Sequence, residues 1–325
     1  MKRFLLLFFG LTSLLSASNL AKIYLNQGLE AVGVELEKEL TNKKFWLDEL
    51  SGKDLSLGYY NSDATIVVTN KTEKTFKVFF YKDGKLIQQF DEKVGVTGLM
   101  GDKEVEGDLK TPIGFYDLGK RFDPPSDYYG VAAFATNYPN LLDRVQNKTG
   151  GGIWIHGYPL SGERLDEVKT RGCIALYNDV LNRFAKFMER QKETFAMTEE
   201  QAVVRTNADE IATLLASLFS WKDKWRVSDI KAYLEFYDEK EFKRFDKKNF
   251  KEFAQMKKAI FSKNEKKSIK FSNISVSPYP NLKNEKIFRI TYYQDYYTAN
   301  YQFRGNKTLY VKLDANNKMK ILVEQ

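Results

Sequence analysis

The spacing of apolar residues changes along the chain, and its first regular pattern is helical. Over residues 20–60, Leu25, Leu29, Val32, Leu36 and Leu40 recur at the spacing of one helix face, with charged residues between them. This pattern predicts one or two short helices in a segment that we place at residues 19–61. A single apolar stripe cannot form a core of its own. We therefore expect it to pack on the rest of the chain, with a homodimer through this segment as the alternative.

From Ala64 onward the pattern is that of β-strands. β-branched and aromatic residues predict strands at 65–69, 76–81 and 86–90, with a tight turn at 82–85 joining the last two. Two more strands are predicted at 153–156 and 173–176, followed by a helix that Asn178 or Asp179 can cap. Strands without helices between them indicate a mainly β domain, which we place at residues 62–195.

A second unit begins after a predicted linker at residues 195–205. Asn207 and Glu210 have the spacing of a helix N-terminus and precede a helical stripe, and further helical patterns cover 228–238 and 246–261. Strand-like segments follow at 269–276, 286–297, 308–314 and 319–323. The order of helices first and an antiparallel sheet afterwards predicts an α+β domain over 206–325, and it resembles NTF2-like domains.

The N-terminus has the pattern of an export signal. Lys2 and Arg3 precede an apolar run that ends at Leu15, and small residues follow at 16–18. We expect residues 1–18 to be a cleavable signal peptide. A membrane anchor is the alternative, although the run is shorter than the roughly 20 apolar residues that a span requires, and no later segment is apolar enough to cross a membrane. The formal charge is +8. Outside the cytoplasm this charge suggests an anionic polymer such as cell wall, with a role in solubility alone as the alternative.

The candidate chemistry rests on two residues, because the chain has one cysteine and one histidine. These counts exclude an internal disulfide and a zinc site built from Cys and His. Strand alternation puts His156 on one face with Trp154, and Cys173 on one face with Ala175. If the two strands pair with matching faces, thiol and imidazole meet as a nucleophile and its base. The alternative is a buried structural cysteine and a hydrogen-bonded core histidine.

Three ordered elements carry a resemblance to a known family. Thr111-Pro112-Ile113-Gly114, then His156-Gly157, then Thr170-Arg171-Gly172-Cys173 resemble the L,D-transpeptidase (YkuD-type) catalytic domain over about residues 62–190. Arg171 stands where many members have a second histidine. With its leading helical segment and its NTF2-like domain, the whole α+β layout is similar to the cell-shape L,D-carboxypeptidases of curved and helical Gram-negative bacteria.

The resemblance implies a role for each residue of the site. Cys173 would be the nucleophile, His156 the general base and then the acid, and the carbonyl of Gly157 would orient the imidazole. The N–H groups of Gly172 and Cys173 are candidates for an oxyanion hole. Arg171 would bind a substrate carboxylate or form a structural salt bridge, and Trp154 is expected to contact substrate. No cofactor and no metal is implied.

The implied substrate is a peptidoglycan stem peptide in the periplasm. A carboxypeptidase would remove the terminal D-alanine from a tetrapeptide and so influence cell shape. An L,D-transpeptidase that crosslinks stems, and a non-catalytic wall-binding module, are the alternatives. Ser228-x-x-Lys231 and Lys148-Thr149-Gly150 match two motifs of penicillin-binding enzymes in reversed order, and we treat both as chance. Aromatic residues at 292–303 predict cross-strand pairs on a half-buried sheet, with sugar stacking as the alternative.

Overall fold

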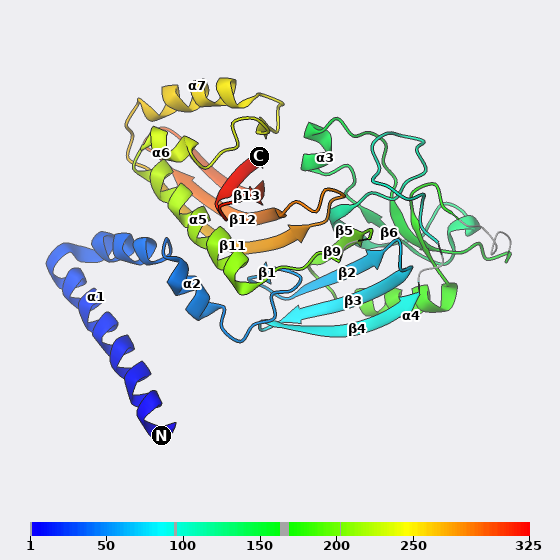
Figure 1. Ribbon diagram of the computed structural model, residues 1–325, viewed down its shortest axis with the longest axis horizontal. Helices are drawn as coiled ribbons and strands as arrows, with labels where there is room; N and C mark the ends of the chain where they lie inside the picture. The colour runs from blue at the N-terminus through cyan, green and yellow to red at the C-terminus, as the bar shows by residue number, and fades with distance from the viewer. Residues whose placement is uncertain (1, 94–95, 163–168, 202) are drawn as a thin grey trace.

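The computed structural model describes residues 2–93, 96–162, 169–201 and 203–325, with side chains from residue 19 onward. It contains two sheets joined side by side, with an N-terminal helical arm that extends away from them (Figure 1). The side chains of the predicted signal peptide lie outside the described residues. In the part of the chain that is described, no helix is both long enough and apolar enough to cross a membrane.

The helical arm consists of α1 (Lys2–Glu39) and α2 (Lys43–Glu49). Helix α1 is interrupted at Gly28, whose φ of +82° is not helical. Leu25 and Leu29 are 80% and 73% exposed, so the expectation that the whole apolar stripe packs within the chain is wrong. The part of the arm after Gly28 does contact the C-terminal domain: Glu30 and Glu37 pair with Lys266 and Lys222, and Trp46 stacks on Phe219 with ring centroids 5.7 Å apart.

The first sheet has eight strands in the order β4-β3-β2-β9-β5-β6-β7-β8. Its core strand β2 is buried along its whole length, because its neighbours β3 and β9 cover both edges and further elements cover both faces. The bounds are β2 (Ala64–Asn70), β3 (Thr75–Lys82), β4 (Lys85–Lys93), β5 (Gly114–Phe122), η1 (Asp127–Tyr129), β6 (Ala133–Thr136), α3 (Leu141–Val145), β7 (Trp154–Gly157), β8 (Ile174–Leu176), α4 (Asn178–Met188) and β9 (Thr194–Glu199).

Strand β9 corrects the predicted linker. Residues 194–199 pair in parallel with β2 and antiparallel with β5, so they lie in the middle of the first sheet. The polar ends of this strand, Thr194 and Glu199, resemble a linker in sequence, yet Ala196 and Met197 are buried. The predicted cap of α4 is also wrong. The N-cap is Tyr177 without a side-chain bond, and Asn178 donates instead to the carbonyl of Tyr158.

The second sheet confirms the α+β pattern of the C-terminal unit. Its six strands follow the order β1-β11-β12-β13-β14-β10, and α5 lies across one face (Figure 1). Asn207 caps α5 by accepting from the amide of Glu210. The bounds are β1 (Tyr59–Tyr60), α5 (Ala208–Arg226), α6 (Ile230–Leu234), β10 (Lys243–Arg244), α7 (Phe250–Phe261), β11 (Ser268–Tyr279), β12 (Ile287–Tyr297), β13 (Gln302–Leu313) and β14 (Met319–Glu324).

The two sheets share one buried cluster at their junction. Apolar residues of both, including Phe115 and Met197 from the first and Tyr310 from the second, pack in it. Polar contacts cross the same junction, where Arg289 of β12 binds Asp117 of β5 at 2.8 Å and Asn140 donates to the hydroxyl of Tyr279 at 3.0 Å. The first sheet is therefore held against the C-terminal domain by buried apolar packing as well as by polar contacts.

Candidate active site

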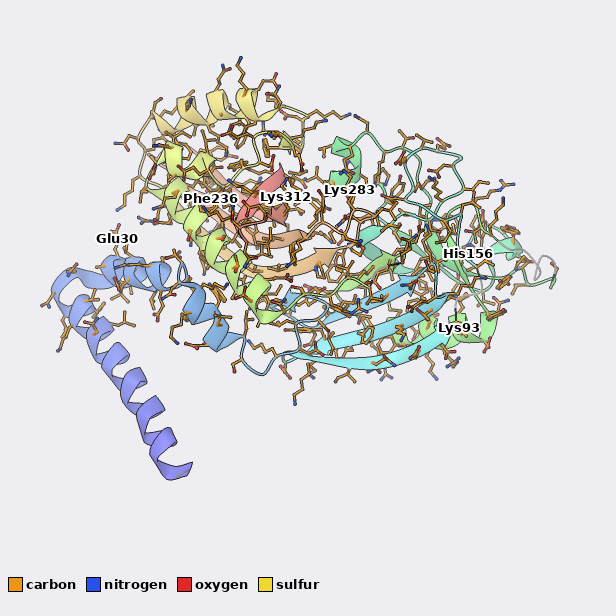
Figure 2. All side chains as sticks on the ribbon, viewed as in Figure 1. Glu30, Lys93, His156, Phe236, Lys283 and Lys312 are labelled. Atoms are coloured by element: carbon orange, nitrogen blue, oxygen red, sulfur yellow. The ribbon has the colours of Figure 1, made fainter. Side chains whose placement is uncertain are left out.

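The candidate nucleophile and base lie on neighbouring parallel strands. Strands β7 and β8 pair with His156 opposite Ala175, and Cys173 directly precedes β8. His156 is labelled in Figure 2, at the end of the molecule far from the helical arm. The expected pairing of these two strands is confirmed. The register places Cys173 beside the start of β7, two residues from His156.

The thiol of Cys173 lies beside the first residue of β7. Its Sγ accepts from the amide of Trp154 and lies near the carbonyl of Gly152, each at 3.5 Å. Burial raises the pKa of the Cys173 thiol, and the Trp154 amide and the Lys103 ammonium oppose that rise. A thiol that is neutral at pH 7 needs a base to take its proton before it can attack a carbonyl.

His156 is placed to be that base. Its Nδ1 lies 2.6 Å from the carbonyl oxygen of Gly157. Because a carbonyl only accepts, Nδ1 carries the proton and Nε2 keeps a free lone pair. Burial lowers the pKa of the His156 imidazole, so the neutral form that can accept a proton is favoured. The ring of Tyr129 meets the imidazole edge-on with centroids 5.1 Å apart, which limits how the ring can turn.

Gly157 occupies a site that has no space for a side chain. A Cβ there would lie 2.1 Å from Oδ1 of Asn178 and 3.0 Å from Leu181. This close packing fixes the carbonyl that orients His156. The arrangement gives Gly157 the position that the resemblance implied for it.

Gly172 is also required by the backbone. Its φ is +121°, and a Cβ would lie 2.8 Å from the carbonyl oxygen of Lys110. Its amide donates to Oγ1 of Thr170 at 3.1 Å, so it is already engaged. Within the described residues the amide of Cys173 donates no hydrogen bond. Cys173 is thus the better of the two expected oxyanion-hole donors.

The two remaining predicted substrate contacts lie at the rim. Trp154 is half-buried and meets Phe122 and Tyr129 edge-on, at 5.1 Å in each case. The side chain of Arg171 is exposed, and among the described residues it forms no ion pair. Arg171 precedes Cys173 by two residues, so a substrate carboxylate bound to it would lie near the thiol.

Two threonines that the sequence did not single out for the site hold the nucleophile. Oγ1 of Thr170 donates to the carbonyl of Cys173 at 2.6 Å, and Oγ1 of Thr111 does so at 3.4 Å. Both threonines belong to the motifs quoted above, so their place in these motifs could have indicated a role at the site. A hydroxyl beside a motif cysteine is a hydrogen-bond donor of the kind that fixes a loop.

Comparisons with known proteins agree with this geometry. Residues 64–204 match the family model of the L,D-transpeptidase catalytic domain, residues 213–325 that of the Cds6 C-terminal NTF2-like domain, and residues 16–51 that of the Csd6 N-terminal dimerization domain. The helical cell shape determining protein Pgp2 of Campylobacter jejuni is 60% identical, with a TM-score of 0.84 over 88% of this chain and 100% of that chain. The chain belongs to the YkuD-type L,D-transpeptidase family.

Two other relatives share less sequence with the chain. Bdellovibrio bacteriovorus Bd1075 is 27% identical, with a TM-score of 0.63 over 83% of this chain and 95% of that chain. The putative L,D-transpeptidase YafK of Escherichia coli K12 is 32% identical over 121 residues. That match covers 36% of this chain and 44% of the length of YafK. The family membership and the match to a cell-shape protein indicate an enzyme that acts on the cell wall.

Proposed function

We propose that this L,D-transpeptidase family member is a periplasmic L,D-carboxypeptidase that removes the terminal D-alanine from peptidoglycan stem tetrapeptides. The observation that carries the proposal is the pair of strands β7 and β8, which place Cys173 beside His156 with the imidazole oriented by Gly157. The 60% identity to a cell-shape protein supports a wall-trimming role.

The geometry suggests the following steps. Nε2 of His156 takes the thiol proton, and the Cys173 thiolate attacks the carbonyl at the L-centre of the third residue. The amide of Cys173 stabilises the oxyanion of the tetrahedral intermediate. The intermediate collapses, D-alanine leaves with the proton from His156, and a thioester remains. Water, deprotonated by His156, hydrolyses the thioester and leaves a tripeptide and the free thiol.

The alternatives differ after the thioester forms. If an amine of another stem replaces water, the same acyl-enzyme produces a crosslink, which is L,D-transpeptidation. If Cys173 is inert, the protein is a wall-binding module. The half-buried thiol and its raised pKa are the same whether water or an amine attacks the thioester. Only the identity of the product distinguishes these reactions.

The first prediction concerns the product formed from a disaccharide tetrapeptide. We expect residues 19–325 to release one alanine, as measured by mass spectrometry, and a Cys173→Ala variant to release none. A crosslinked dimer, or exchange of the terminal residue for an added D-amino acid, would favour the transpeptidase. If the masses of the muropeptide and of intact sacculi both stay unchanged, the result would favour the non-catalytic wall-binding module.

Export and dimerization are further parts of the proposal. The signal-like residues 1–18 would deliver the chain to the periplasm, and N-terminal sequencing of the mature protein tests this. The exposed Leu25 and Leu29, in the segment that matches a dimerization domain, would pair with a second copy. A monomer in sedimentation equilibrium would contradict the homodimer.

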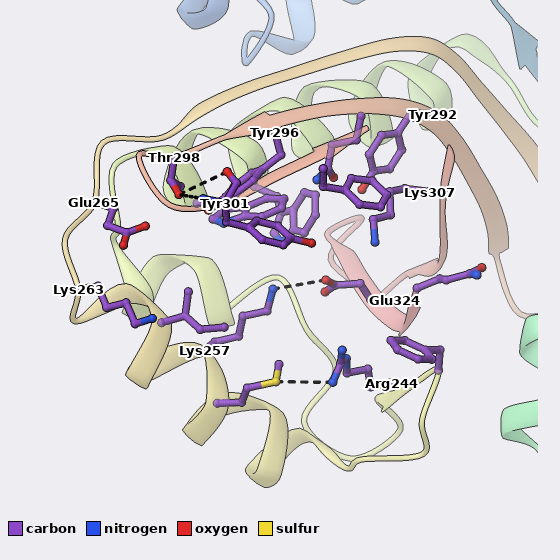
Figure 3. Close-up of a pocket in the computed structure, with 18 residues that line it drawn as sticks. Arg244, Lys257, Lys263, Glu265, Tyr292, Tyr296, Thr298, Tyr301, Lys307 and Glu324 are labelled. Carbon is purple, nitrogen blue, oxygen red and sulfur yellow. Dashed lines mark hydrogen bonds and ion pairs between the residues drawn. The ribbon is translucent and has the colours of Figure 1, made fainter. Parts of the chain in front are cut away.

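The C-terminal domain offers a binding pocket of about 430 Å³. Tyr296 and Trp225 stack on one another in its wall at 5.1 Å, and the ring of Tyr301 is 60% exposed. Figure 3 shows that basic side chains and Glu324 face the aromatic rings, with Lys257 and Glu324 in contact at 3.4 Å.

The aromatic residues predicted as sheet pairs do pair, since Tyr296 is opposite Phe303, and they also line this pocket. We propose that the pocket binds wall polymer and positions it.

The second prediction separates pocket binding from catalysis. We expect Tyr301→Ala to weaken binding to intact sacculi about 5-fold or more, because burying an aromatic side chain against a ligand contributes roughly 1.5–3 kcal/mol. Activity on a soluble muropeptide should stay within about twofold. Tyr293→Ala is the matched control, since Tyr293 points to the other face of β12 and does not line the pocket. Equal losses in both variants, measured by sacculus pull-down, would exclude the pocket.

A further inference from the structure

A buried ion pair lies where two central strands of the catalytic sheet end. Strands β2 and β9 run in parallel, so the residues after their carboxyl ends are neighbours, and the amide of Lys71 donates to the carbonyl of Glu199 at 2.9 Å. Nζ of Lys71 lies 2.7 Å from Oε2 of Glu200. The two side chains are 0% and 4% exposed, so neither charge reaches water.

Both charges bind the backbone of one loop. Nζ of Lys71 donates to the carbonyl of Gly101 at 2.6 Å and to that of Thr111 at 3.2 Å. The carboxylate of Glu200 accepts from the amide of Gly101 at 2.8 and 2.9 Å. The pair therefore holds Gly101 by both of its backbone groups, and Gly101 has a φ of +93°, which few other residues adopt.

The same loop, residues 96–112, forms one wall of the active site. At its start, Val96 exchanges two backbone hydrogen bonds with Ala175, at 2.8 and 3.2 Å. At its end, Oγ1 of Thr111 donates to the carbonyl of Cys173 and accepts from the amide of Gly98 at 2.8 Å. The carbonyl of Lys110 fills the space beside Gly172. Whatever fixes the loop also fixes the Gly172–Cys173 peptide.

Stability alone does not explain the pair. Taking two charges out of water is costly, and apolar residues of similar size often stabilise a fold as well or better. A buried pair gives directional hydrogen bonds that apolar residues cannot give. Here those bonds go to Gly101 and Thr111 of the active-site loop.

We propose that Lys71 and Glu200 are positioning residues for catalysis. They touch no substrate. They hold the loop 96–112 so that the amide of Cys173 faces the oxyanion of the acylation step. This inference rests on the proposed carboxypeptidase function.

The test compares two neighbouring carboxylates. Glu200→Gln removes a charge that binds the loop. Glu199→Gln is the matched control, because Glu199 is also buried and is paired with Arg205 at 2.8 Å but does not bind the loop. With a tetrapeptide muropeptide, we expect kcat to fall about 10-fold or more in Glu200→Gln with KM within twofold, and both constants to stay within twofold in Glu199→Gln.

Alkylation of Cys173 by iodoacetamide, above the thiol pKa, provides the second readout. The reaction needs the thiolate and no oxyanion hole, and the hydrogen bonds of the sulfur itself go to Trp154 and Gly152, outside the loop. We expect the alkylation rate of Glu200→Gln to stay within twofold of wild type. A parallel loss of alkylation and turnover would mean a collapsed site and would overturn the proposal.

A double variant covers the case in which Glu200→Gln does not fold. Lys71→Met with Glu200→Met replaces the pair by apolar side chains. We expect it to melt at or above the wild-type temperature and still to lose about 10-fold in kcat. Wild-type kcat in this folded variant would overturn the proposal.

Hydrogen exchange separates this proposal from the proposed function. In Glu200→Gln the amides of residues 97–112 should exchange about 10-fold faster than in wild type, whether or not any muropeptide is a substrate. Unchanged exchange would overturn the positioning role. An inactive wild type with faster exchange in the variant would overturn only the proposed function.

Discussion

Replacing His156 with glutamine should lower kcat/KM on a tetrapeptide muropeptide by about 10²–10⁴-fold, the usual contribution of a general acid–base. Glutamine keeps a donor for the carbonyl of Gly157 but cannot take the thiol proton. The fold should survive, because the substituted side chain is polar and similar in size, and circular dichroism checks this. Retention of more than a tenth of wild-type activity would exclude His156 as the base.

The pH profile of the wild type tests the same role. The neutral imidazole is the base, so kcat/KM falls as the pH drops through the pKa of His156. Burial lowers that pKa from its ordinary value of 6.5, so we expect the acid limb to lie below pH 6.5. The limb should be absent in His156→Gln. Half-maximal activity near pH 7.5 would contradict a base that burial keeps neutral.

Gly172→Ala should have the other large effect, a loss of about 100-fold or more in kcat together with a lower melting temperature. A Cβ would lie 2.8 Å from backbone at Lys110 and 3.0 Å from Ile153, and its φ of +121° strains any other residue. Strain of this kind costs about 1–3 kcal/mol. Relief of that strain must shift the Gly172–Cys173 peptide, which carries the proposed oxyanion donor.

Gly151→Ala is the control for this prediction. A Cβ at Gly151 would meet nothing closer than 3.9 Å, at the carbonyl oxygen of Tyr138. Activity and melting temperature of Gly151→Ala should therefore stay near those of the wild type. A Gly172→Ala variant that matches Gly151→Ala in both measurements would show that the Gly172 conformation is dispensable.

The sequence was most informative where a short pattern determines its own structure. The alternation around His156 and Cys173 predicts two strands, and these two strands are present and pair as β7 and β8. Asn207 with Glu210 predicts a capped helix that begins where α5 does. Such features depend only on residues a few positions apart, so the local sequence is enough to predict them.

Features that depend on distant partners could not be predicted. Strand β9 is polar at both ends, and only its neighbours β2 and β5 make it a central strand. Leu25 is exposed because no other part of the described chain packs on its face of α1. Helical spacing predicts that such a face exists but not which partner covers it. Lys71 and Glu200 are 129 residues apart in the chain and meet only because two parallel strands end together.

The position of β9 has a consequence for the order of folding. Each half of its pairing joins segments that are far apart in the chain, since Thr65 pairs with Thr194 and Phe115 with Met197. Closing such long loops costs entropy before any contact repays it, and folds rich in distant contacts form slowly. The sheet cannot close until residue 199 is available. Strands β2–β4 on one side of β9 and β5–β8 on the other therefore join late, after residue 199 has been made, and a fragment that ends before β9 should remain unfolded.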